Sequence, residues 1–287
     1  MKIIAIVVLY NDNTEEAAYN VMMLARQVDK VCLVDNSADA CPERFKDIGN
    51  AVYLPQYQNK GIAAAQNVGL RYAFEQGADY VLFADPDSTT PEQAVDMLSE
   101  TYQRLVGQGY NVGGVGSVAR NKMTQQMYPL RSNLLRELPE LNVKEVTYTM
   151  NSISLYPTQL FKDVGLMDES LFIDGVDCEF CWRAATRGFR FLLDNNVVID
   201  HVLGMGTKTI GGKARAMTPP FRMYYQYRNF LWLCRRDYVP RKWLLENGRN
   251  YIVKALYYPL MVAPRWRYLK NICRGIAAGV RLQGKNS

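Results

Sequence analysis

The sequence feature that most constrains the fold is an apolar run that leads directly into two carboxylates. Residues 80–84 read Tyr-Val-Leu-Phe-Ala, and Asp85-Pro86-Asp87 follows without a break. Such a run is typical of a buried strand in a parallel sheet, where ligands bind beyond the carboxyl ends of the strands. Aspartates at i and i+2 in extended chain point to the same side. Such a pair of carboxylates suits a site for Mg²⁺ or Mn²⁺ that also binds a diphosphate. A turn at the strand end that provides a helix N-cap explains the two aspartates equally well.

Strand and helix patterns alternate along the first hundred residues. The expected strands are 2–10, 30–34, 52–54 and 80–84, and the expected helices are 14–27, 62–76 and one that begins near residue 91. The alternation predicts an α/β fold, doubly wound with a mostly parallel sheet.

Polar side chains follow three of these strands, namely Tyr10-Asn11, Asp35-Asn36-Ser37 and Asp85-Pro86-Asp87. The carboxyl ends of parallel strands share one edge of a sheet, so we expect the three clusters to lie close together. A turn or a cap explains each cluster taken alone. As a ligand contact, Asp35 would accept a hydrogen bond from a base or a ribose hydroxyl.

The segment before the second helix suggests a phosphate contact. Asn59 and Gly61 precede Ile62, and backbone N–H groups at a helix N-terminus attract phosphate. Asn67 lies inside that helix, where asparagine has poor propensity, so it is either an exposed polar residue or a nucleotide contact. The chain has neither Gly-x-Gly-x-x-Gly nor Gly-Lys-Ser/Thr, so the Rossmann dinucleotide and P-loop classes lack support.

Taken in order, these segments resemble family 2 glycosyltransferases, which are inverting enzymes of the GT-A fold. The matching segments are Val7–Asn11, Val34–Ser37, Asn59–Gly69 and Phe83–Ser88. Three later segments, Leu166–Arg183, His201–Gly204 and Tyr224–Asn229, are similar to the bacterial rhamnosyltransferase branch. The resemblance covers roughly residues 3–230.

The resemblance implies roles for individual residues. Asp177 would be the catalytic base. Asp87 would bind the metal and the diphosphate, and Asp85 would contact either the ribose or the metal. His201 would complete the metal or diphosphate site. The implied nucleotide-sugar contacts are Tyr10, Asn11, Asp35, Asn59, Gly61, Asn67 and Asp85.

The sequence departs from the family pattern at two places near these residues. Val176 replaces a glutamate that precedes the base in many relatives, and Ile153 stands where relatives usually have glycine. The residues alone predict a helix from about Gly175 to Arg187, with Asp174 and Asp177 at its start. Helix capping is therefore an alternative to catalysis for both aspartates.

The net charge changes sign along the chain. Residues 213–287 hold 16 Lys and Arg but 2 Asp and Glu, a charge of +14, whereas residues 1–212 carry −8. We therefore predict two parts, a GT-A domain over 1–211 and a basic, aromatic, helical extension over 212–287. The longest apolar run of the extension, 255–263, is too short to span a bilayer. Its aromatic and basic residues suit an anionic membrane surface; plain packing is the first alternative, and nucleic acid is not expected.

Cysteine usage indicates a reducing compartment. The six cysteines are scattered, and Cys178 and Cys181 form one Cys-x-x-Cys in a chain with a single histidine. A structural zinc site is therefore not expected, and these thiols are predicted to pack in the core. No secretory signal is evident. We expect a cytoplasmic protein, peripheral on the inner face of the cytoplasmic membrane.

The expected function is inverting transfer of a sugar to an acceptor hydroxyl, with Mg²⁺ or Mn²⁺ as cofactor. The rhamnosyl resemblance implies dTDP-L-rhamnose as donor and a lipid-linked saccharide as acceptor, in surface-polysaccharide synthesis such as O-antigen or capsule. One alternative keeps the chemistry with a UDP-sugar such as UDP-galactofuranose. A sugar nucleotidyltransferase would need a Gly-rich basic loop, which residues 9–16 do not offer, and a silent binding module would have lost Asp87 or Asp177.

Overall fold

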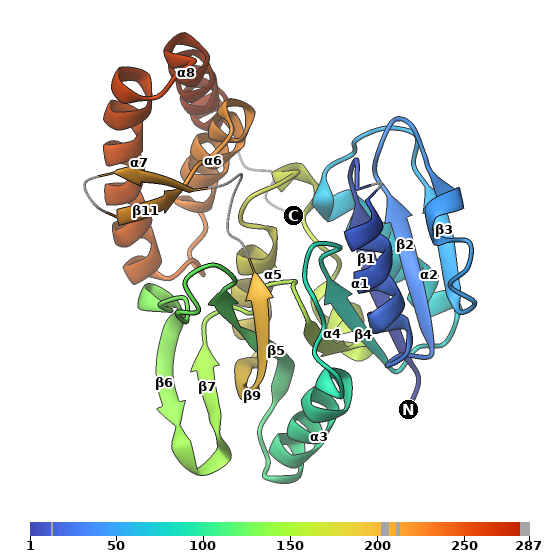
Figure 1. The fold of residues 1–287 in the computed structure, drawn as a ribbon. Helices are drawn as coiled ribbons and strands as arrows, with labels where there is room; N and C mark the ends of the chain where they lie inside the picture. Colours follow the sequence, from blue (N-terminus) through green and yellow to red (C-terminus); the bar gives the residue numbers. More distant parts are fainter. Residues whose placement is uncertain (13, 202–206, 211–212, 282–287) are drawn as a thin grey trace. The chain divides into compact units, whose positions relative to one another are not determined.

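The computed structural model describes residues 1–281 except 13, 202–206 and 211–212, together with the backbone alone of 201, 207–210 and 213–216. The chain divides into two compact units (Figure 1). The first comprises residues 1–172 and 176–201, and the second comprises residues 173–175 and the chain from 202 onward. The boundary predicted at 211–212 falls on residues outside this description.

The first unit is built on a nine-stranded mixed sheet in the order β3-β2-β1-β4-β8-β5-β9-β7-β6. The strands are β1 Ile3–Leu9, β2 Lys30–Asp35, β3 Ala51–Pro55, β4 Tyr80–Ala84, β5 Val112–Asn121, β6 Leu134–Leu138, β7 Val143–Val146, β8 Ser154–Pro157 and β9 Arg190–His201. The α-helices are α1 Glu15–Ala25, α2 Ile62–Glu75, α3 Ala94–Gly107, α4 Thr158–Val164 and α5 Val176–Ala185. The predicted α/β fold is confirmed.

The first four strands form the parallel part of the sheet, as the sequence predicts. β1 pairs in parallel with β2 and β4, and β2 pairs in parallel with β3. β8 then runs antiparallel to both β4 and β5, while β5 and β9 are again parallel. The hairpin of β6 and β7 completes the sheet at the far side of β9. The carboxyl ends of β1, β2 and β4 therefore share one edge.

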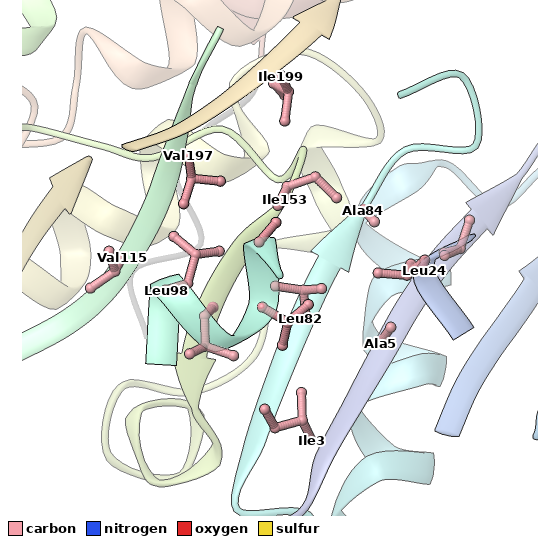
Figure 2. Packing of buried hydrophobic residues seen from close by; sticks show 14 of the residues in the cluster. Ile3, Ala5, Leu24, Leu82, Ala84, Leu98, Val115, Ile153, Val197 and Ile199 are labelled. Carbon is pink, nitrogen blue, oxygen red and sulfur yellow. The ribbon is translucent and has the colours of Figure 1, made fainter. Parts of the chain in front are cut away.

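Alternation along β1 explains why both faces of the sheet are covered. Ala5 lies in register with Leu82 of β4, and both side chains join a buried cluster with Leu24 of α1 and Leu98 of α3 (Figure 2). Ile6 points to the other face, where α2 approaches so closely that a methyl group added at Gly69 would lie 2.4 Å from Ile6. Helices thus pack on both faces, as a doubly wound fold requires.

The second unit contains three helices, α6 Pro220–Leu233, α7 Arg241–Met261 and α8 Arg265–Arg281, and a two-stranded ribbon, β10 Thr207–Ile210 with β11 Lys213–Ala216. Its core is a cluster of three tyrosines and three aliphatic or thioether side chains, Met223, Tyr227, Tyr258, Val262, Tyr268 and Ile272. The helical character predicted for the C-terminal extension is confirmed. Among the described residues, no helix has the length and hydropathy needed to cross a membrane.

Candidate active site

The turn after β4 is held in place by a hydrogen bond of its own backbone and by two hydrogen bonds to α1. The Ser88 amide donates to the Asp85 carbonyl at 3.2 Å and closes the turn. Asn20, buried on α1, donates from its amide nitrogen to the Pro86 carbonyl at 2.9 Å and accepts from the Thr89 hydroxyl at 3.1 Å. Asp85 and Asp87 are therefore presented on an ordered turn at the sheet edge, rather than on a free loop.

Five carboxylates at this edge, Asp12, Asp35, Asp85, Asp87 and Asp177, each interact electrostatically with at least one other of the group. Burial, and then the charges of Asp87, Asp177 and Asp12, raise the pKa of Asp85 to about 7. Burial raises the pKa of Asp12 as well, and Asp87 and Asp35 add to the effect. The Ser152 hydroxyl, a hydrogen-bond donor to Asp85, acts in the opposite direction. Like charges this close resist ionisation together, so the arrangement favours a cation among them.

The residues present fit a divalent cation that is shared with a phosphate ligand. Within the described residues, Asp12, Asp85 and Asp87 form no ion pair with lysine or arginine, and the Asp87 residue is exposed. The same part of the chain contains no group of three His, Cys, Asp or Glu side chains placed to hold a metal by themselves. Mg²⁺ is usually bound through one or two carboxylates, with substrate phosphates and waters as the other ligands. Asp85 and Asp87 can supply that share.

Asp177 lies in the first turn of α5, where the helix dipole stabilises a negative charge. Its carboxylate accepts from the Asn151 backbone amide at 3.4 Å. Asp174, the alternative acidic residue, belongs to the second unit and forms an ion pair with Arg222. Asp177, not Asp174, is the carboxylate that interacts with Asp85.

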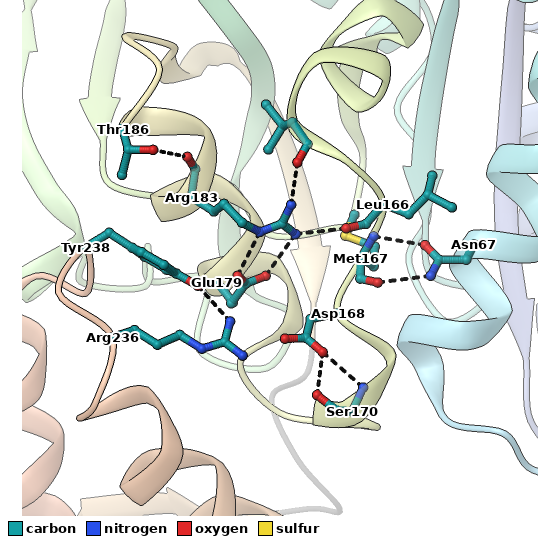
Figure 3. A network of polar contacts seen from close by, with 11 residues as sticks. Asn67, Leu166, Met167, Asp168, Ser170, Glu179, Arg183, Thr186, Arg236 and Tyr238 are labelled. Atoms are coloured by element: carbon teal, nitrogen blue, oxygen red, sulfur yellow. Dashed lines mark hydrogen bonds and ion pairs between the residues drawn. The ribbon is translucent and has the colours of Figure 1, made fainter. Parts of the chain in front are cut away.

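A buried ion pair fixes α5, and with it Asp177. The Glu179 side chain has no exposed surface and pairs with Arg183 one turn later, with 2.8 Å from Oε1 to Nε (Figure 3). Arg183 also donates to the carbonyls of Val164 and Leu166, at 2.7 and 2.8 Å. The helix is thereby tied to the end of α4 and to the residues that follow it.

The segment Asn151–Ile153 connects Asp177 to Asp85. The Ser152 hydroxyl lies 2.9 Å from that of Ser88 and also bonds Asp85, while the preceding amide bonds Asp177. Ile153 is fully buried and has φ +55°, a conformation that β-branched residues rarely adopt. Ile153 is one of the two positions at which the sequence is expected to depart from the family pattern, and its backbone is strained beside Ser152.

On the nucleotide side, Asp35 is buried at the end of β2. Its carboxylate accepts from the Ser37 amide at 2.9 Å and from the Tyr53 hydroxyl. Asn59 accepts from the Gly61 amide at 2.9 Å and from the Asn36 side chain at 3.1 Å. Asp35 and Asn59 are therefore positioned by the protein, and their predicted contact with a nucleotide stays a prediction.

Gly61 is needed where the chain enters α2. Its φ is +86°, and an added methyl group would lie 2.6 Å from the Phe172 ring and carbonyl oxygen. The Phe172 carbonyl accepts from the Ile62 amide at 2.7 Å. One of the backbone donors at this helix N-terminus is thus already used, which leaves fewer for the phosphate predicted there.

Asn67 has a structural role that the sequence did not reveal. It is 1% exposed, so its interpretation as an exposed polar residue is wrong. Its amide donates to the Met167 carbonyl at 3.0 Å and to Glu169 at 2.9 Å, and its oxygen accepts from the Met167 amide at 2.9 Å (Figure 3). Since these bonds use both ends of the amide, we leave Asn67 out of the proposed nucleotide contacts.

The remaining predicted residues lie at the ends of β1 and β9. Tyr10 is about half exposed, and its amide donates to Asp12 at 2.7 Å. The Asn11 amide donates to the Ser37 hydroxyl at 2.8 Å, which connects the ends of β1 and β2. The backbone of His201 pairs with Asn121, but its side chain, and therefore its predicted role as a ligand, lies outside the described residues.

Sequence reasoning missed Asp12, Asn20 and Ser152. Asp12 sits between two asparagines in a segment interpreted only as a loop, although a carboxylate after a parallel strand was a usable signal. Asn20 and Ser152 act through contacts to residues more than 60 positions away, which no local pattern reports.

Comparison with known proteins identifies what this arrangement resembles. The model of the family "Glycosyl transferase family 2" matches residues 4–162, more than half of the chain. The dTDP-rhamnosyl transferase RfbF of Shigella flexneri is 29% identical, over 97% of this chain and 95% of the relative. The galactofuranosyltransferase GlfT1 of Mycobacterium tuberculosis is 27% identical, over 78% of this chain and 79% of the relative.

Two solved structures share the fold. The S. aureus TarS fragment 1–349, crystallised with UDP-GlcNAc, has a TM-score of 0.59 at 17% identity and aligns with 97% of this chain and 81% of that one. GalNAc-T7 with UDP, GalNAc and Mn²⁺ has a TM-score of 0.57 at 12% identity, over 96% of this chain and 55% of that one. At these identities the likeness concerns the fold alone.

Proposed function

The chain belongs to glycosyl transferase family 2 and is a glycosyltransferase of GT-A fold, and we propose that it transfers L-rhamnose from dTDP-L-rhamnose, with inversion, to a hydroxyl of a lipid-linked saccharide. The observation that carries this proposal is the group of carboxylates at the sheet edge. Asp85 and Asp87 follow β4, and Asp177 opens α5 within electrostatic range of Asp85. A sugar transferase needs a site for the donor's diphosphate and a base for the acceptor, and these residues supply both.

Asp177 is assigned the role of general base. It takes the proton from the acceptor hydroxyl, and the acceptor oxygen then attacks the anomeric carbon from the face opposite the diphosphate. The bond between that carbon and the diphosphate oxygen breaks, and the electron pair leaves with the nucleotide diphosphate. One displacement inverts the anomeric configuration, and the proton taken by Asp177 balances the reaction.

Asp85 and Asp87 are assigned to the divalent cation, Mg²⁺ or Mn²⁺, and His201 remains a third candidate ligand. The cation, when bound, neutralises the charge that collects on the leaving diphosphate. The raised pKa of Asp85 supports this assignment, because the neighbouring carboxylates repel one another and a cation would relieve that repulsion. Asp35, Tyr10, Asn11, Asn59 and Gly61 are assigned to the nucleotide.

The donor proposal rests on the relative that aligns with nearly the whole chain. The dTDP-rhamnosyl transferase of Shigella flexneri covers both units, whereas the galactofuranosyltransferase relative covers about four fifths of the chain. UDP-galactofuranose is therefore the second candidate donor. Transfer from either donor would follow the same chemistry at the same carboxylates of this chain.

The second unit supports a lipid-borne acceptor and a location at an anionic membrane surface. Several large apolar side chains of α7 are more than half exposed, namely Leu245, Ile252, Val253, Leu256, Leu260 and Met261. Most of them repeat at helical spacing on one side, whereas Trp243 and Tyr258 are buried on the other. A helix that is apolar on both sides, in a unit rich in Lys and Arg, is suited to a headgroup interface. We place the protein on the inner face of the cytoplasmic membrane and assign the acceptor to surface-polysaccharide synthesis.

A panel of nucleotide sugars tests the donor directly. Melting temperatures would be measured with dTDP-rhamnose, dTDP, UDP-galactofuranose and UDP-glucose, each with Mn²⁺, Mg²⁺ or EDTA. A ligand at a hundredfold excess over its dissociation constant stabilises by about 2.7 kcal/mol. We expect the largest shift with dTDP-rhamnose and metal, and little shift in EDTA. A larger shift with UDP-galactofuranose would move the donor to that sugar, and no shift with any compound would contradict the proposal.

A further inference from the structure

A pocket of about 500 Å³ lies between α6 and α8, entirely within the second unit. It is lined by Tyr224, Arg228, Arg274, Ala277, Ala278 and Arg281. Three of these six residues are arginines and none is acidic. The volume is within the usual range for small-ligand sites.

Helical spacing and close packing build this pocket. Arg274 and Arg281 are seven residues apart on α8, so they lie on one face about 10 Å apart along the axis. The alanines between them leave room above the helix. On the opposite wall, Tyr224 and Arg228 are neighbours one turn apart on α6. The helices touch at Gly275, where an added methyl group would lie 2.5 Å from the Tyr224 carbonyl oxygen.

The pocket concentrates positive charge. The guanidinium groups of Arg228 and Arg274 lie 5.6 and 5.9 Å from the centre of the same Tyr224 ring. In the described part of the chain, neither Arg274 nor Arg281 forms an ion pair. From residue 213 onward the acidic residues are Asp237 and Glu246, and neither lines the pocket. Like charges gathered in a hollow attract an anion.

We propose that this pocket binds the phosphate or diphosphate group of the acceptor lipid. Guanidinium groups hold phosphoryl oxygens by paired, charge-assisted hydrogen bonds, and they do so without a metal. The methyl groups of Ala277 and Ala278 give an apolar wall to a hydrocarbon attached to the phosphate. The inference deepens the proposed function and rests on it for the identity of the ligand. The phosphoryl group of an anionic phospholipid has the same chemistry and is the other source.

The test compares two charge-matched double variants of α8. Arg274→Gln with Arg281→Gln removes two arginines from the pocket, whereas Arg267→Gln with Lys270→Gln removes two exposed cations of the same helix outside it. Binding of inorganic pyrophosphate and of farnesyl diphosphate would be measured by calorimetry in EDTA, which suppresses metal-dependent binding at the carboxylates. We expect the pocket variant to bind both at least tenfold more weakly and the control to bind them as the wild type does. Equal affinities in the pocket variant and the wild type would overturn the proposal, as would a wild type that binds neither compound.

Two further measurements identify the source of the phosphate and separate this inference from the proposed function. Competition by phosphatidylglycerol vesicles at equal phosphate concentration would assign the pocket to a phospholipid headgroup, and lack of competition would assign it to the diphosphate of the acceptor. In a transfer assay, the pocket variant should raise KM for a diphosphate-linked acceptor at unchanged kcat. If the wild type transferred no sugar but the pocket variant still lost pyrophosphate binding, the proposed function would be contradicted and the pocket assignment would stand.

Discussion

At the scale of single residues, the site is a set of carboxylates placed closer together than their charges favour. Partial burial and the nearby charges of Asp87, Asp177 and Asp12 raise the pKa of Asp85 to about 7. Repulsion of this kind costs folding free energy, and a bound cation offsets it. The exposed member, Asp87, is the one that a cation and a phosphate can reach from solvent.

Asp87→Ala should abolish divalent-dependent turnover and leave the fold intact, because Asp87 is exposed. The loss should exceed about 100-fold, since charge neutralisation by a metal is worth several kcal/mol in the transition state. The measurement is turnover with Mn²⁺ and with EDTA, together with circular dichroism. Asp39→Ala removes an equally exposed carboxylate after β2 and should be neutral. Full activity in Asp87→Ala would refute the metal assignment.

Several residues of the site were predictable because strand ends carry their own signal. Asp35 and Asp85 each stand at the end of an apolar run, which is visible in the sequence. The structure pairs Leu9 at the end of β1 with Asp35 at the end of β2, so these strand ends share an edge as predicted. Asn67 was not predictable, because its partners lie 100 residues away and only the packing of α2 brings them together.

At the scale of elements, the local sequence pattern predicts the N-terminal strands of the sheet but not the order of all its strands. The four N-terminal strands are predictable because each is an apolar run followed by a turn. The insertion of β8, antiparallel, between β4 and β5 was not, because strand order depends on pairing between segments about 40 to 75 residues apart. That strand follows the Asn151–Ile153 segment, so the unpredicted element completes the site.

The ion pair between Glu179 and Arg183 in α5 is expected to stabilise the first unit, because the Glu179 side chain has no exposed surface. Arg183→Met should lower the free energy of unfolding by about 3–5 kcal/mol, because Glu179 would remain buried without its partner. Arg187→Met, an exposed change just after the same helix, should stay within about 0.5 kcal/mol of the wild type. Urea unfolding followed by circular dichroism measures both. Equal midpoints for the two variants would show that the ion pair contributes nothing to stability.

At the scale of the whole molecule, charge and apolar surface are divided between the two parts of the chain. Residues 1–212 are acidic overall and hold the carboxylate site, whereas residues 213–287 carry +14. The exposed apolar face of α7 belongs to the basic part. The sequence revealed the change of charge, but only the packing of α7 shows which of its side chains remain uncovered.

The membrane assignment predicts that the protein sediments with vesicles that contain anionic lipid and that high salt releases it. Leu256→Glu should weaken this binding by roughly tenfold or more, because it places a negative charge on the apolar face of α7. Leu135→Glu changes a leucine of similar exposure in the sheet unit and should have little effect. If Leu256→Glu and Leu135→Glu bound the vesicles equally well, α7 would not be the membrane-binding element. If the protein bound neutral and anionic vesicles equally well, its binding would not depend on electrostatic attraction.

The most direct test of the catalytic account is the Asp177→Asn variant, which keeps the size and hydrogen bonding of the side chain but cannot take a proton. Donor affinity would be measured by calorimetry and transfer rate by product assay, with Asp174→Asn as the matched control. We predict near-normal donor affinity for Asp177→Asn and a transfer rate lower by about 10²–10⁴-fold, the usual contribution of a general base. Asp174→Asn should be the milder change, because Asp174 pairs with Arg222 and Asp177 is the one that interacts with Asp85. Parallel loss of donor binding and transfer in Asp177→Asn, or a larger loss of transfer in Asp174→Asn, would contradict the assignment of Asp177 as the base.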